Sequence, residues 1–277
     1  MTANLSLGIS PCPNDTFIFH GLIHGLAPAD PGFGLSRLVM ADVEELNTLA
    51  IEGQLDVVKI SMAAVAGVAN DYWLLGSGAA LGRGCGPLLL ARPGLESGGT
   101  IARLALPGPH TTAALLAEMA GIGGQRIQMR YDKIMPAVAA GEVDAGVVIH
   151  EGRFVYKALG LKLLMDFGQW WEARFGLPLP LGVIAAKRSL GRELAGRVQR
   201  AIRASLEHAF ADPKAGREFI MANAQELADE VVDSHISTFV TDFSRDMGQE
   251  GRGAVLALAE AAFKLAGRQG QVPELFV

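Results

Sequence analysis

Short apolar runs alternate with longer helix-like stretches through the first part of the chain. Strands are predicted at 5–9, 35–40 and 57–60, and helices from Phe17, over 43–51 and over 62–69. This order of strands and helices is typical of a parallel sheet covered by helices. The first helix is expected to be capped within Asn14-Asp15-Thr16, which follows a rigid turn at 10–13.

A second set of the same kind begins after residue 100. Strands are predicted at 104–106, 127–130, 145–149 and 161–167, and helices at 111–119 and 133–140. The segment 92–99 is expected to carry the chain to a second sheet and 178–184 to return it, before a helical region over 190–266. The pattern predicts an α/β fold of two lobes around a ligand cleft, as in periplasmic binding proteins. The expected lobes are residues 1–95 with 176–277, and residues 96–175.

One phrase occurs twice, about ninety residues apart. Gly53-Gln54-Leu55-Asp56 precedes an apolar run that ends in Lys59-Ile60-Ser61, and Gly141-Glu142-Val143-Asp144 precedes one that ends at His150. Each copy is typical of a helix, a glycine stop, a turn and a buried strand with a polar end. Ligands of open α/β sheets bind outside the carboxyl ends of the strands. The two copies therefore predict two half-sites that face one ligand.

His150 is the candidate for proton transfer in the second half-site. A neutral imidazole can take a proton near physiological pH, which makes His150 a candidate general base. The alternative is a core or capping histidine with satisfied hydrogen bonds. The sequence contains no Gly-x-Ser-x-Gly motif, so a nucleophilic triad is disfavoured.

Lys59 and the pair Thr111-Thr112 are the candidates for binding. A lysine seldom ends a buried strand unless it is paired or reaches a cleft, although it can also extend to solvent while Ser61 caps the next helix. Two threonines at a predicted helix start, beside unpaired backbone N–H groups, suit an anion such as a carboxylate; ordinary N-capping is the alternative. Arg83 is a further cation near the expected cleft.

Composition excludes several classes of protein. The formal net charge is −5 and no long basic run occurs, which argues against nucleic acid and anionic membranes as partners. No apolar run is long enough to span a bilayer and no signal-peptide pattern is present, so a cytoplasmic protein with Cys12 and Cys85 as free thiols is expected. His20 and His24 have zinc-like spacing without the accompanying glutamate, and no metal or cofactor is expected.

Strings along nearly the whole chain match one known family. They are Ser10-Pro-Cys-Pro-Asn-Asp-Thr-Phe-Ile-Phe19, Asp42-Val-Glu-Glu-Leu-Asn47, Lys59-Ile-Ser61, Leu81-Gly-Arg-Gly84, His110-Thr-Thr112, Arg130-Tyr-Asp132, Ile149-His-Glu151, Leu177-Pro-Leu-Pro-Leu-Gly182 and Leu275-Phe-Val277. In these strings the chain resembles the 1,4-dihydroxy-6-naphthoate synthases of the futalosine pathway of menaquinone biosynthesis. The resemblance implies a type II periplasmic-binding-protein-like fold used as a cytoplasmic enzyme.

The resemblance also implies a reaction and a set of site residues. The enzyme would be a carbon–carbon lyase that converts cyclic dehypoxanthinyl futalosine to 1,4-dihydroxy-6-naphthoate and releases a small carbon fragment, with no cofactor or metal. His150 would be the proton acceptor. The substrate-binding residues would be Lys59, Ile60, Ser61, Thr111 and Thr112, with Asp15 and Asn47 as further candidates. The aromatic carboxylate of the substrate would suit the helix start at Thr111.

Two alternatives remain open at this point. One is chorismate dehydratase, which acts in the same pathway on a different substrate. The other is a solute-binding protein that closes on a carboxylate ligand without chemistry. The oligomeric state is not predicted.

Overall fold

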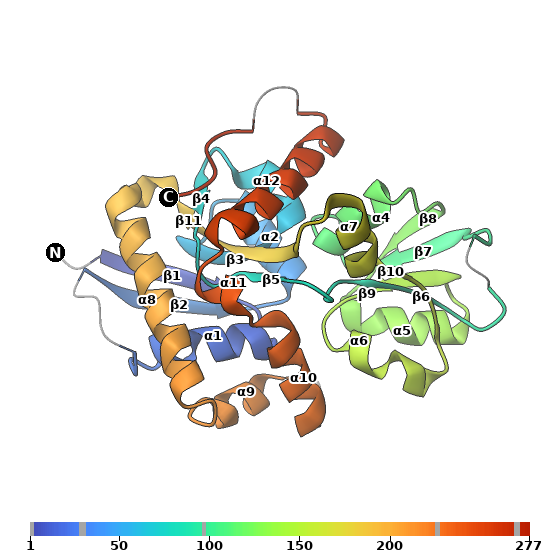
Figure 1. Cartoon of the computed structure of the whole chain (residues 1–277), viewed down its shortest axis with the longest axis horizontal. Helices are drawn as coiled ribbons and strands as arrows, with labels where there is room; N and C mark the ends of the chain where they lie inside the picture. Colours follow the sequence, from blue (N-terminus) through green and yellow to red (C-terminus); the bar gives the residue numbers. More distant parts are fainter. Residues whose placement is uncertain (1–2, 28–31, 96–97, 225–227, 269–271) are drawn as a thin grey trace.

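The chain folds into two α/β lobes that lie side by side along its longest axis (Figure 1). A computed structural model describes residues 3–27, 32–95, 98–224, 228–268 and 272–277. A six-stranded sheet forms the first lobe and a five-stranded sheet the second. The predicted α/β fold of two lobes is confirmed. Within the described ranges, the helices are all too short or too polar to cross a membrane.

The elements follow the predicted alternation through the first two thirds of the chain. The strands are β1 (Ala3–Ile9), β2 (Phe33–Met40), β3 (Val57–Ser61), β4 (Tyr72–Leu74), β5 (Ala80–Gly82), β6 (Leu88–Ala91), β7 (Arg103–Leu106), β8 (Gln125–Gln128), β9 (Ala145–Val148), β10 (Lys162–Asp166) and β11 (Leu179–Lys187). The helices are α1 (Pro13–Ile23), α2 (Val43–Ile51), α3 (Val65–Val68), α4 (Thr112–Met119), α5 (Tyr131–Ala140), α6 (Gly152–Val155), α7 (Phe167–Phe175), α8 (Gly191–Ala211), α9 (Arg217–Asn223), α10 (Asp229–Phe239), α11 (Asp242–Arg245) and α12 (Gly248–Leu265).

Both sheets are mixed rather than wholly parallel. In the first, of order β2-β1-β3-β11-β4, β1 is parallel to β2 and β3, but β11 is antiparallel to β3 and also pairs with β5. In the second, of order β10-β6-β9-β7-β8, β7 is parallel to β8 and β9, but β6 is antiparallel to β9. The prediction of parallel pairing is therefore right within the strand–helix–strand units. For the crossing strands β6 and β11 the sequence predicted no pairing; they run antiparallel to their neighbours because they enter from the other lobe without a crossover helix to reverse them.

The first crossing between the lobes comes earlier than the sequence pattern suggested. Leu88–Ala91 already belongs to the second sheet, where β6 pairs with β9 and β10. Of the segment 92–99, where the crossing was expected, residues 96 and 97 lie outside the described residues. We therefore propose that the second lobe begins before Leu88 rather than at residue 96.

Two predicted element starts are shifted. Helix α1 begins at Pro13 with Cys12 as its N-cap residue, so Asn14, Asp15 and Thr16 lie inside its first turn. Proline suits the first helical position because its φ is already helical and its missing N–H would have no helical partner there. Strand β8 ends at Gln128 because the helix predicted from Lys133 begins two residues earlier, at Tyr131.

Helices cover both faces of the first sheet and bury two apolar clusters. One cluster, which includes Ile18, Ile184 and Ile202, joins β11 to α1 and α8. The other continues from the first lobe into the second and includes Trp171, whose indole donates a hydrogen bond of 3.0 Å to the carbonyl of Pro178. Trp171 therefore has a packing role.

The doubled phrase folds the same way twice. Gly53 and Gly141 both adopt positive φ, +66° and +79°, which ends the preceding helix at low steric cost. Asp56 then accepts hydrogen bonds from the N–H and hydroxyl of Ser6 in the middle of β1, and Asp144 accepts from the N–H of Arg103 at the start of β7. In each lobe the aspartate ties its strand to the parallel neighbour.

Asp56→Asn is expected to destabilise the protein by about 2 kcal/mol, because hydrogen bonds to a charged acceptor are lost. Burial acts to raise the pKa of Asp56, but the hydrogen bonds from Ser6 and the charge of Lys187 outweigh it and lower the pKa. The carboxylate therefore stabilises the fold above its ordinary pKa and loses this effect as the pH falls through the lowered value. Urea unfolding should show the difference at pH 7 and little difference near pH 2. Glu52→Gln, at an exposed position in the same turn, should change stability by less than about 0.5 kcal/mol.

Candidate active site

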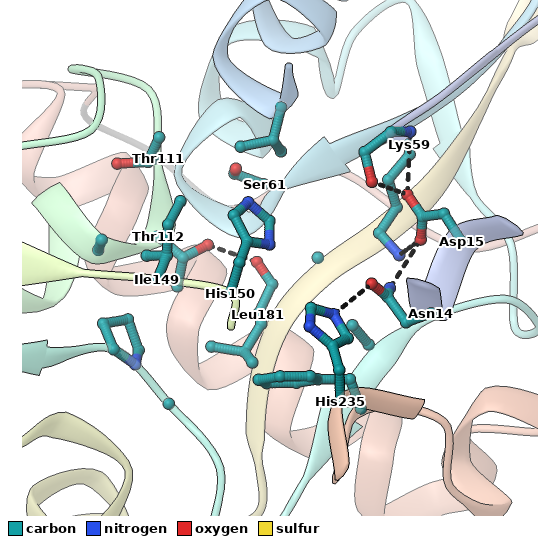
Figure 2. Close-up of a pocket in the computed structure, with 18 residues that line it drawn as sticks. Asn14, Asp15, Lys59, Ser61, Thr111, Thr112, Ile149, His150, Leu181 and His235 are labelled. Carbon is teal, nitrogen blue, oxygen red and sulfur yellow. Dashed lines mark hydrogen bonds and ion pairs between the residues drawn. The ribbon is translucent and has the colours of Figure 1, made fainter. Parts of the chain in front are cut away.

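A pocket lies between the two lobes; together with the open solvent at its mouth it has an empty volume of about 650 Å³ (Figure 2). Its polar lining consists of Ser10, Asn14, Asp15, Lys59, Ser61, Thr111, Thr112, His150 and His235. The first lobe supplies the residues of α1 and β3, and the second supplies the threonines and His150. The half-sites that the doubled phrase predicted therefore meet in one pocket.

Ile60 and Asn47 lie behind the pocket wall. Side chains alternate along a strand, so Lys59 and Ser61 face the pocket while Ile60 packs, fully buried, in the hydrophobic core. Asn47 is fully buried too; its Oδ1 accepts from the Ser61 N–H at 2.8 Å and its Nδ2 donates to the Ser61 hydroxyl at 3.1 Å. Asn47 therefore orients Ser61 and leaves the Ser61 hydroxyl proton free to donate into the pocket.

A buried ion pair joins Lys59 to Asp15. Lys59 Nζ lies 2.7 Å from Asp15 Oδ1, and the two side chains are 5% and 1% exposed. Asp15 also accepts hydrogen bonds from the N–H and hydroxyl of Ser10 and from the side-chain amide of Asn14. The charge of Lys59 is thus largely neutralised by Asp15. Where these two residues line the pocket, a ligand meets a polar network with little net charge.

Thr111 and Thr112 use their hydroxyl protons within the protein. Thr111 is the N-cap of α4: its hydroxyl accepts from the N–H of Ala114 and donates to the carbonyl of Gly108 at 2.7 Å. The Thr112 hydroxyl accepts from the N–H of Met62 at 2.9 Å and donates to the carbonyl of Leu181 at 2.5 Å. Because Met62 and Leu181 belong to the first lobe, Thr112 links the two lobes. The donors left for an anion at this helix start are backbone N–H groups.

His150 has a backbone conformation that marks it within the described residues. With φ of +55°, it is the one non-glycine residue there with positive φ. Such a conformation costs free energy in a residue with a Cβ and, in active sites, is retained where it directs a functional side chain. It follows the end of β9 and turns the imidazole into the pocket, as Figure 2 shows.

Two rings and a thiol lie around the His150 imidazole. Cys12 Sγ is 3.4 Å from His150 Nδ1, the Tyr131 ring meets the imidazole edge-on at 4.8 Å, and the His235 ring stacks at 6.2 Å. Burial, followed by the charge of Glu151, raises the pKa of the Cys12 thiol well above its ordinary value, and burial is also the main cause of the raised pKa of Tyr131. Both groups stay protonated near neutral pH, so neither competes with His150 for a proton.

His235 is a pocket residue that the sequence pattern did not reveal. It lies on α10 and is 1% exposed, and its Nε2 is 2.9 Å from Asn14 Oδ1. Burial, and then the charges of His150 and Lys59, lower its pKa well below the ordinary value. The sequence alone does not show whether a histidine on an amphipathic helix lines a pocket or packs in the core.

Arg83 lies at the junction of the lobes rather than in the pocket. It pairs with Glu250 at 2.6 Å and donates to the carbonyl of Gly176. The charge of Arg83 is therefore neutralised by Glu250, and its contacts help to hold the crossing strands in place. Cys12 and Cys85 are free thiols, as expected, and both are buried.

The comparisons with known proteins agree with the resemblance found in the sequence. The model of a family described as menaquinone biosynthesis matches residues 5–264. A 1,4-dihydroxy-6-naphthoate synthase of Thermus thermophilus is 48% identical over 93% of this chain and 93% of its own. The same enzyme of Streptomyces coelicolor is 43% identical over 98% of this chain and 95% of its own.

Solved structures support the fold. A crystal structure of a protein from Archaeoglobus fulgidus superposes with a TM-score of 0.86 at 31% identity, covering 95% of this chain and 98% of that one. The periplasmic aliphatic sulphonate binding protein of Escherichia coli superposes with a TM-score of 0.65 at 12% identity, covering 99% and 91%. The second likeness concerns the fold alone.

Proposed function

We propose a specific reaction for this chain, which belongs to the menaquinone biosynthesis family. It is the lyase reaction in which cyclic dehypoxanthinyl futalosine is split to 1,4-dihydroxy-6-naphthoate and a small carbon fragment, with His150 as general base. The observation that carries the proposal is His150 itself, held at positive φ with its imidazole in the pocket of a chain 48% identical to a named synthase.

The residues of the pocket suit a reaction that begins with loss of a proton. His150 provides a ring nitrogen for the proton, and its neighbours Cys12 and Tyr131 are held protonated, so neither competes for it. Formation of an aromatic product supplies the driving force, so the protein needs to position the substrate and move protons.

Contacts between the two lobes hold them together beside the pocket. Thr112 bridges to Met62 and Leu181, and Asn47 donates to the carbonyl of His110 at 3.2 Å. Glu44 accepts from the imidazole Nδ1 of His110 at 2.7 Å. Closing a site in this way protects reactive intermediates and strengthens the polar interactions inside it.

The alternatives have less support. The named relatives are synthases, which favours catalysis over solute capture, and the likeness to a binding protein at 12% identity concerns the fold alone. Neither named relative is a chorismate dehydratase. On the same support we infer a cytoplasmic location, where a biosynthetic enzyme would work.

The function is tested by incubating the purified protein with cyclic dehypoxanthinyl futalosine. We expect stoichiometric release of 1,4-dihydroxy-6-naphthoate, followed by its fluorescence and identified by mass. Chorismate, offered in parallel, should not be dehydrated. Turnover of chorismate with no reaction of the cyclic compound would replace the proposed function with its alternative, and binding without turnover of either would indicate a solute-binding protein.

We propose that the substrate carboxylate lies between the start of α4 and the Ser61 hydroxyl. Ser61→Ala should raise KM about tenfold with kcat nearly unchanged, because one hydrogen bond to a charged group is lost in substrate and transition state alike. Binding of naphthalene-1,4-diol, which lacks the carboxylate, should be the same in Ser61→Ala and the parent protein. An equal loss of affinity for both ligands would place the carboxylate elsewhere.

A further inference from the structure

The two ring nitrogens of His235 have different surroundings. Nε2 lies 2.9 Å from Oδ1 of Asn14, whose side-chain N–H donates to the Asp15 carboxylate at 2.8 Å. Because a carboxylate can only accept, the Asn14 amide nitrogen must face Asp15, and Asn14 Oδ1 must accept from His235. Nε2 therefore carries the proton, and in the neutral ring Nδ1 holds the lone pair.

Nδ1 of His235 is a buried acceptor, and within the part of the chain that the structure describes no group donates a hydrogen bond to it. The nearby carboxylate oxygen, Glu151 Oε2 at 3.8 Å, is an acceptor as well and cannot satisfy it. An unpaired buried acceptor costs free energy, and Nδ1 belongs to a residue that lines the pocket. This arrangement fits a ligand that brings the missing donor.

We propose that Nδ1 of His235 accepts a hydrogen bond from a hydroxyl group of the substrate and then takes its proton, as a second proton-transfer group beside His150. The proposal rests on the lyase function proposed above. The rings of His235 and His150 lie 6.2 Å apart and nearly parallel, at 11°, so both can contact one substrate in the pocket (Figure 2). Lowering of the His235 pKa by burial keeps Nδ1 unprotonated and ready to accept.

The proton and the electrons balance without a co-reactant. When the substrate O–H bond breaks, its electron pair forms the C=O bond of the leaving fragment. The adjacent carbon–carbon bond breaks, and its electrons remain on the carbon skeleton that becomes aromatic. His235 receives the proton, becomes an imidazolium beside the Glu151 carboxylate, and returns the proton to the product skeleton.

The variant His235→Gln should remove proton transfer by residue 235 while keeping its structural hydrogen bond. The glutamine amide N–H can reach the Asn14 oxygen as Nε2 does, but an amide is no base. We expect kcat to fall at least a hundredfold, KM to stay within threefold and Tm to stay within about 2 °C of the parent. His20→Gln is the matched control, since His20 is also a mostly buried histidine but packs against His24 and Phe219; its kcat should stay within threefold.

Two results would overturn the proposal. One is a His235→Gln protein that folds and keeps kcat within threefold of the parent, and the other is a loss carried by KM and Tm while kcat holds, which would indicate a structural role. A parent protein that makes no naphthoate would instead contradict the function on which the proposal rests.

The ring state of His235 can be read in the unmodified protein, whether or not the variant folds. Nitrogen-15 NMR of labelled histidines, with His235 assigned by its contacts to Asn14 and Phe239, should show protonated Nε2 and unprotonated Nδ1 from pH 6 to 8. The groups that face this ring and bear on its charge are His150 and Glu151 after β9, Lys59 on β3, and Asp15 through Asn14 on α1. A ring protonated on Nδ1 could not accept the proton, and that result would overturn the proposal.

Discussion

His150→Asn should lower kcat about a thousandfold, within the range that a positioned general base contributes, while substrate binding changes little. Asparagine tolerates positive φ better than other side chains, so the backbone conformation at +55° should survive the substitution. The measurement is single-turnover formation of the fluorescent naphthoate, with substrate affinity determined separately by calorimetry. Residual activity within tenfold of the parent would contradict the role of general base.

His150→Gly tests whether the strained backbone at His150 serves function rather than stability. Glycine adopts φ of +55° at no steric cost, so this variant should be as stable as the parent or more stable by up to about 1 kcal/mol, and equally inactive. A gain in stability with a loss of activity is the signature of strain retained for function. His110→Asn, at an exposed histidine on the lobe contact, is the control and should keep most of its activity.

Sequence reasoning succeeded where local patterns determine structure. The doubled phrase predicted the strands β3 and β9, because a glycine stop, an aspartate and an apolar run are all read from neighbouring residues. It also predicted that Lys59, Ser61 and His150 would meet, since strand ends of two facing sheets border one cleft. The N-cap alternative for Thr111 is confirmed, with its hydroxyl bonded to the N–H of Ala114.

The sequence could not supply the contacts between distant segments. His235 reaches the pocket from α10 and bonds to Asn14, more than two hundred residues earlier, and no local spacing encodes that pairing. The direction of β6 and β11 depends on the path between lobes rather than on side-chain periodicity. The ion pair of Lys59 with Asp15 was missed too, since the two residues are distant in the sequence. Asp15 was expected at a helix cap but lies inside the first turn of α1.

Asp15→Asn should produce the largest loss of stability among the site variants, about 3–5 kcal/mol, or roughly 10 °C in Tm for a chain of this size. The substitution leaves the Lys59 ammonium buried, and among the described residues the Gly78 carbonyl, at 3.4 Å, is the acceptor that still bonds to it. An unpaired buried charge costs more than the pair contributes, since the desolvation of the ion is no longer offset. Glu193→Gln, which breaks the exposed pair with Arg197 at 2.8 Å, should cost less than about 0.5 kcal/mol.

The double variant Asp15→Asn with Lys59→Met should recover at least half of that loss, because removing the second charge removes the desolvation penalty. It should nevertheless turn over substrate at least tenfold more slowly than the parent, since Asn14 and through it the Nε2–H of His235 are oriented by the Asp15 carboxylate. Recovery of stability without recovery of turnover would mean that the charged pair is kept for the geometry of the pocket rather than for the fold. A double variant no more stable than Asp15→Asn alone would show that the loss comes from the hydrogen bonds of Ser10 and Asn14, and not from the stranded lysine.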